Sequence, residues 1–226
     1  MSKNKHQEKN DEPIALDVQL SKSEAFIEKN WKKIAVVLGI AVVVVVGFYI
    51  YKHYMQGREV EAQKAIAGAQ TAFAQQQYDI ALNGEGNVKG FLKIMDEYSG
   101  TETANLAKLY AGLAYAKTDK TDEAVKMLEG FSAQDDEMIS PSAIAALGNL
   151  YVQKGDKEKG AKTLVKAAEE ADNDAISPIC LLQAGEVYES LGQNDKAVTL
   201  YNKIKDQYFR SAIAQQIDMY IERATK

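Results

Sequence analysis

Histidine, cysteine and proline are scarce in this 226-residue chain, which holds two, one and three of them. Neither His6 nor His53 has a cysteine or carboxylate partner at the spacing of a zinc site or a catalytic triad. Cys180 has no second cysteine for an intramolecular disulfide; we expect a small buried residue, with intermolecular pairing as the alternative. The sequence therefore predicts no catalytic residue, no metal site and no cofactor, as expected for a protein that is not an enzyme.

Positive charge is also scarce in the larger part of the chain. Residues 52–226 have a formal net charge of −6, and no basic stripe runs through them. Nucleic-acid-binding proteins need clustered lysine and arginine side chains to neutralise phosphates. This balance argues against a nucleic-acid partner and favours partners that are proteins.

One long apolar run stands near the N-terminus. Ile34–Tyr51 is 18 residues long without a charge or a proline, which is the length of a membrane span. Residues 1–33 contain seven lysines, whereas residues 52–71 contain three basic residues, and the more basic flank of a span stays in the cytoplasm. We therefore expect a cytoplasmic leader at 1–33, a single transmembrane helix at 34–51 and a domain at 52–226 on the outer side. A buried core helix is the alternative for the apolar run.

A pattern of glycine and tyrosine recurs three times in the second half of the chain. The copies are Gly112–Tyr115, Gly148–Tyr151 and Gly185–Tyr188, and their tyrosines lie 36 and then 37 residues apart. Periods of this size are typical of arrays of helical hairpins. We expect residues 57–100 to be a divergent first repeat with an insertion, and residues 211–224 to be one amphipathic helix that caps the array.

The repeated glycines have distinct expected roles. Gly148 and Gly185 lack a Cβ atom, so the second helix of each hairpin can approach closely there. Gly155 and Gly192 are expected to end the first helices in the left-handed conformation. Ser140 and Ser177, each followed by a proline, are expected to cap the first helices.

These positions resemble the tetratricopeptide repeat, which implies an all-α fold, an α-solenoid. In that family the inner face of the first helices holds a partner segment. By position, the resemblance implies a protein-binding groove, of which Leu106, Leu109 and Ile179 also form part. Its candidate residues are Leu113, Asn149, Val152, Gln153, Leu182, Glu186 and Glu189. Simple packing between helices is the alternative, above all for Leu106 and Leu109.

The whole layout resembles the membrane-anchored family of the ancillary Sec translocon subunit. The resemblance rests on "LSKSEAFIEKNWKKI" at 20–34 and "QYDIALNGEGNVKGFLKIMDEYSGT" at 77–101. It implies a protein of the bacterial inner membrane with its repeats in the periplasm. The implied function is that of an adaptor whose partners are translocon subunits, periplasmic chaperones and exported chains. A scaffold of another envelope machine, for outer-membrane assembly or cell division, is the alternative.

Overall fold

The structure is a computed structural model that describes residues 15–226, so residues 1–14 of the predicted leader lie outside it. The described chain forms two compact units divided between Tyr54 and Met55. Its elements are α1 (Ala15–Ala74), α2 (Tyr78–Asn83), β1 (Gly84–Glu85), β2 (Val88–Lys89), α3 (Phe91–Glu97), α4 (Glu102–Lys117), α5 (Thr121–Glu129), α6 (Ile139–Gln153), α7 (Lys157–Ala171), α8 (Ser177–Ser190), α9 (Asn194–Gln207), a 3-10 turn (Ala214–Gln216) and α10 (Ile217–Ala224).

The first unit presents an apolar helical surface. Val43 and Tyr49 are 71% and 73% exposed, and their large apolar neighbours are exposed as well. By length and composition, α1 is apolar enough to cross a membrane. It begins before the predicted span and continues past it to Ala74, so both predicted domain boundaries, 33/34 and 51/52, fall inside one helix.

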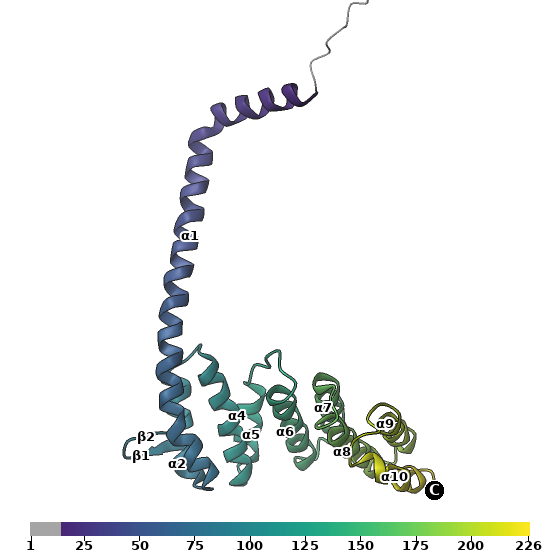
Figure 1. Cartoon of the computed structure of the whole chain (residues 1–226). Helices are drawn as coiled ribbons and strands as arrows, with labels where there is room; N and C mark the ends of the chain where they lie inside the picture. The colour runs from purple at the N-terminus through teal and green to yellow at the C-terminus, as the bar shows by residue number, and fades with distance from the viewer. Residues whose placement is uncertain (1–14) are drawn as a thin grey trace, which may run out of the picture. The chain divides into compact units, whose positions relative to one another are not determined.

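In the second unit, residues 55–226, helices pack mainly against their neighbours in sequence (Figure 1). The most extensive packing is between α6 and α7, between α7 and α8, and between α8 and α9. Buried apolar clusters follow one another along the array; one of them contains Leu181, Tyr201 and Ile217, all 0% exposed. This is the predicted α-solenoid of helical hairpins.

The turn inside each hairpin is built in the same way four times. Gln76, Asp119, Gly155 and Gly192 have φ values of 62°, 58°, 92° and 70°. The following N–H then donates to the carbonyl five residues back, which is a Schellman turn; the pairs are Gln77–Ala72, Lys120–Tyr115, Asp156–Tyr151 and Gln193–Tyr188. The glycine prediction is confirmed, and Gln76 shows that the end of α1 is the first helix of a first repeat.

The small residues beside the tyrosines mark the closest approach of two helices. A Cβ atom added at Gly148 would lie 2.9 Å from Cγ of Leu164, and one added at Gly185 would lie 2.3 Å from the ring of Tyr201. Both contacts lie on the second helix of the same hairpin, as predicted. Gly160, where alanine is usual, has its own reason, because a Cβ there would lie 2.8 Å from the Gly148 carbonyl oxygen.

The predicted insertion in the first repeat is a short hairpin between α2 and α3. Its strands pair in antiparallel register, Gly84 with Lys89 and Glu85 with Val88. Val88 packs onto α1 beside Gly68, where an added Cβ would lie 3.1 Å from a Val88 methyl group. The second helix of this repeat is therefore split into α2 and α3.

The prediction that Ser140 and Ser177 cap the first helices is wrong. The cap positions are Met138 and Ile176, and neither makes a side-chain cap hydrogen bond. The Ser140 hydroxyl instead donates to Asp136, and the Ser177 hydroxyl donates to a backbone carbonyl in α7. The side chains of Asp136 and Asn173, which precede α6 and α8, accept the backbone N–H groups at these turns. The two serines therefore stabilise the connections between helices and do not cap the first helices.

The C-terminal end differs from the predicted single helix over 211–224. The chain first makes a 3-10 turn and then α10, whose Ile217 is fully buried. α10 still packs against α9 and covers the end of the array, as expected of a cap.

Cys180 is buried as predicted, and burial raises the pKa of its thiol to about 11, so the thiolate is disfavoured.

Candidate protein-binding groove

The predicted groove residues lie on three successive first helices, α4, α6 and α8. Asn149, Gln153 and Glu186 are exposed. The other four candidates, Leu113, Val152, Leu182 and Glu189, are half-buried. The structure thus divides the predicted set into side chains that face solvent and side chains that contact the array itself.

The apolar members pack between helices. Leu109 is only 8% exposed and belongs to a buried cluster, against which Leu106 and Leu113 also pack. Val152 lies against Gly160 of α7, where an added Cβ would be 2.4 Å from its Cγ2 atom. Leu182 packs against the cluster around Leu181. Burial of these side chains stabilises the array and leaves little apolar area for a partner.

Glu189 has partners inside the chain. Its carboxylate accepts hydrogen bonds of 2.9 and 2.7 Å from the Arg223 guanidinium of α10, and another from the Tyr201 hydroxyl. The Arg223 hydrogen bonds lower the pKa of Glu189 below its ordinary value, against the opposing effect of partial burial. Glu189 therefore joins α8, α9 and α10, a role that the repeat register alone does not indicate.

The exposed members form a polar and acidic surface across α6 and α8. The Asn149 amide donates to the Gln183 side chain at 3.3 Å, which links the two helices. Gln153 and Glu186 extend this surface, and Ile179, 47% exposed, stands near the start of α8. We call Asn149, Gln153, Ile179 and Glu186 the first-helix surface. Its chemistry suits a partner segment that offers hydrogen-bond donors or positive charge.

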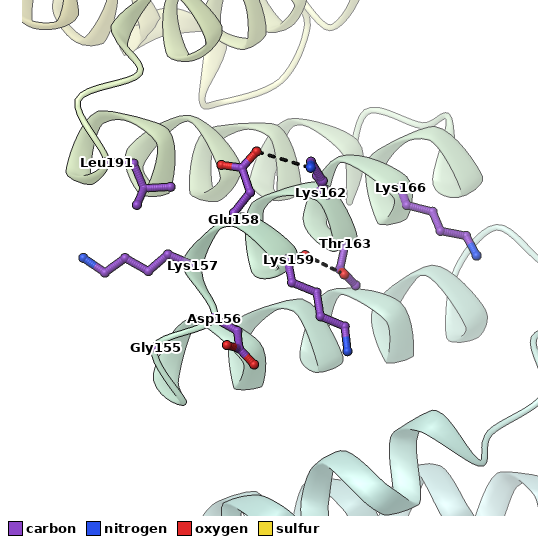
Figure 2. Close-up of a pocket in the computed structure, with 9 residues that line it drawn as sticks. All are labelled: Gly155, Asp156, Lys157, Glu158, Lys159, Lys162, Thr163, Lys166 and Leu191. Carbon is purple, nitrogen blue, oxygen red and sulfur yellow. Dashed lines mark hydrogen bonds and ion pairs between the residues drawn. The ribbon is translucent and has the colours of Figure 1, made fainter.

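Sequence reasoning missed a second surface, on α7. Figure 2 shows Lys159 and Lys166 projecting from one side of α7, while Lys162 turns toward Glu158, 3.3 Å away. A cavity of about 770 Å³ runs along these lysines. The repeat register could have indicated this surface, because the lysines recur at equivalent positions: Lys196 and Lys203 stand 37 residues after Lys159 and Lys166.

Residues for other chemistry do not converge in the described part of the chain. No group of three or more His, Cys, Asp or Glu side chains there is placed to hold a metal ion. The perturbed carboxyl groups belong to structural contacts: Asp136, for example, accepts hydrogen bonds from Ser140 and three backbone N–H groups. The described residues therefore offer surfaces for contact with other molecules.

Comparison with known proteins identifies the fold of the repeats. The model of the tetratricopeptide repeat-like domain family matches residues 24–203. No curated protein matches the chain. Among solved structures, "Crystal structure of MamA protein" is 18% identical with a TM-score of 0.53, and covers 73% of this chain and 86% of that one. A putative kinesin light chain with TPR-like repeats, from Podosopora anserina, is 12% identical with a TM-score of 0.50, covering 76% and 84%. These structures share the fold.

Proposed function

Because the chain belongs to the tetratricopeptide repeat-like domain family, we propose that it is a non-enzymatic, membrane-anchored adaptor that binds proteins through the first-helix surface. The observation that carries the proposal is the exposure of Asn149, Gln153 and Glu186 on neighbouring first helices. The other four candidates of the predicted groove are half-buried in contacts within the array. Repeat arrays of this kind present extended surfaces to partners. A polar, acidic surface of this kind favours contacts that form and dissolve readily.

The anchor in this proposal is the apolar part of α1. Its large side chains are exposed although apolar side chains of that number are normally covered. A bilayer would cover them, with residues 1–33 in the cytoplasm and the repeats in the periplasm, as the lysine distribution favours. The localisation we propose is therefore the bacterial inner membrane.

The partners we propose are translocon subunits, periplasmic chaperones and exported chains. This choice rests on the resemblance of segments 20–34 and 77–101 to the ancillary Sec translocon subunit family. The second candidate is a scaffold for outer-membrane assembly or cell division, which would use the same surface and the same anchor. The two differ in the partner that is captured.

The proposed topology predicts the outcome of protease treatment. Protease added to spheroplasts is expected to digest residues 55–226, because they lie outside the membrane. A tag placed before residue 1 should survive until detergent opens the membrane. Digestion of the tag with protection of the repeats would reverse the orientation, and release of the chain by alkaline carbonate would contradict the anchor.

The proposed surface predicts where partners crosslink. A photo-crosslinking amino acid at Gln153 or Glu186 should capture a partner in cells, whereas the same group at Asn202, exposed on α9, should capture at least about fivefold less. Mass spectrometry of the captured protein separates translocon subunits and chaperones from assembly or division proteins. Equal capture at all three positions would place the binding surface elsewhere.

A further inference from the structure

The second helix of the second repeat is shorter than its counterparts. α5 has 9 residues, whereas α7 and α9 have 15 and 14. The chain leaves the helical conformation after Glu129 and re-enters it at Ile139. About one and a half turns that the other second helices possess are therefore missing from α5.

Beside the missing turns, two apolar side chains of α6 are less buried than their counterparts in the next repeat. Ile144 and Leu147 of α6 correspond, 37 residues on, to Leu181 and Ala184 of α8, which are both 0% exposed. Ile144 and Leu147 themselves are only partly buried. They line a cavity of about 430 Å³ between α5, α6 and α7, together with Leu128, Phe131, Lys159 and Lys166. We call this cavity the α5–α7 groove.

The connection from α5 to α6 is fixed as a wall of this groove. The Asn105 side chain of α4 makes two hydrogen bonds with the backbone of Ser132, at 2.7 and 2.8 Å. Farther on, Asp136 accepts backbone N–H groups of Met138 and Ser140. These contacts hold the connection against α4 and the start of α6, and Phe131 and Ala133 of the connection line the groove together with Ile144 and Leu147.

Of the two lysines on the rim of the groove, Lys159 lies 3.7 Å from the carboxylate of Glu129, which also lines the groove, whereas Lys166 has no such acid beside it. In the next repeat, Lys203 of α9 lies 3.9 Å from Glu169 of α7. One repeat earlier these two positions are Lys166 and Ala133, and Ala133 lies beyond the end of α5. No described residue forms an ion pair with Lys166, which projects from the same side of α7 as Lys159 (Figure 2). The positive charge that is free for a partner is therefore that of Lys166.

We propose that the α5–α7 groove binds an acidic amphipathic segment of a partner protein. Its apolar side chains cover Ile144 and Leu147, as the last turns of α7 cover Leu181. A carboxylate of the segment pairs with Lys166, as Glu169 pairs with Lys203. The segment thus takes the place of the missing turns of α5, which is helix-in-groove recognition. This docking site is separate from the first-helix surface and does not depend on it.

The test uses the full chain in mild detergent and a fluorescein-labelled 14-residue helical peptide with leucines on one face and glutamates on the other. Fluorescence anisotropy should show saturable binding that Lys166→Glu weakens at least fivefold. Ala133→Glu, which supplies an internal partner for Lys166, should also weaken it. Lys203→Glu makes the same charge change one repeat later and should leave the affinity within twofold, as should Glu186→Gln on the first-helix surface.

Several results would overturn the proposal. They are equal weakening by Lys166→Glu and Lys203→Glu, unchanged binding of a peptide with alanine in place of leucine, and equal binding of a peptide with lysine in place of glutamate. Concentration-dependent dimerisation of the chain that Lys166→Glu abolishes would instead assign the groove to a second copy. Circular dichroism must show the same helix content for every variant, and the loss of binding by Ala133→Glu tests the groove without removing any side chain that packs.

Discussion

Gly185→Leu is expected to lower the free energy of unfolding of the repeat array by at least about 3 kcal/mol, the upper end for overpacking. A Cβ atom alone at this position would lie 2.3 Å from the ring of Tyr201. Tyr201 is 0% exposed and has no room to retreat. Any larger side chain must therefore push α8 and α9 apart, which breaks packing on both sides of α9.

Thermal melting of the full chain in detergent, followed by circular dichroism, measures this loss. For a domain of this size, about 3 kcal/mol corresponds to a fall in Tm of roughly 6–12 °C. The matched control is Glu186→Leu, which adds a leucine to the next, exposed position of α8 and should change Tm by less than about 2 °C. Similar losses for both variants would mean that α8 and α9 do not meet at Gly185.

Arg223→Ala is expected to cost about 2 kcal/mol of unfolding free energy, because it removes charge-assisted hydrogen bonds from a carboxylate that is largely shielded. The Glu189 side chain is 17% exposed and its remaining partner is the neutral Tyr201 hydroxyl. The control is Lys226→Ala, which removes an ion pair with Glu222 whose partners are both more than 70% exposed. Such surface pairs contribute at most about 1 kcal/mol.

The same network gives the stability a pH dependence. The pKa of Glu189 is lowered from its ordinary value of 4.5, mainly by the Arg223 hydrogen bonds. Its contribution is therefore complete above pH 4.5 and is lost as the pH falls through the lowered pKa in the folded state. Wild type should lose Tm more steeply below pH 4.5 than Glu189→Gln does. Parallel curves for the two proteins would contradict the role of Glu189.

The sequence predicted the part of the fold that depends on local residues. Three Gly–Tyr copies at constant offsets were sufficient to place Gly155 and Gly192 in the left-handed turns and Gly148 and Gly185 at helix crossings, since these roles need particular side chains. Gln76 occupies the same turn in the first repeat. It escaped prediction because glutamine, unlike glycine, has no local preference for the left-handed conformation.

The candidate surface was predicted less completely, for a physical reason. The repeat register states which helix face a side chain occupies, and Asn149, Gln153 and Glu186 are indeed exposed. The register does not state which side chains of other helices lie opposite that face. Val152 meets Gly160 of α7 and Glu189 meets Arg223 of α10, and both contacts join positions that no short-range pattern connects. The early end of α5 was missed as well, because a repeat pattern presumes helices of equal length.

Packing between sequence neighbours has a consequence for how such an array changes over evolutionary time. Each hairpin meets the next through the same kinds of contact and reverses direction through the same turn, at Gln76, Asp119, Gly155 and Gly192. Duplication or loss of one unit of 36 or 37 residues would join compatible faces and leave the remaining hairpins unchanged. Selection can therefore change the number of hairpins, and with it the length of the array, without altering the core of each hairpin.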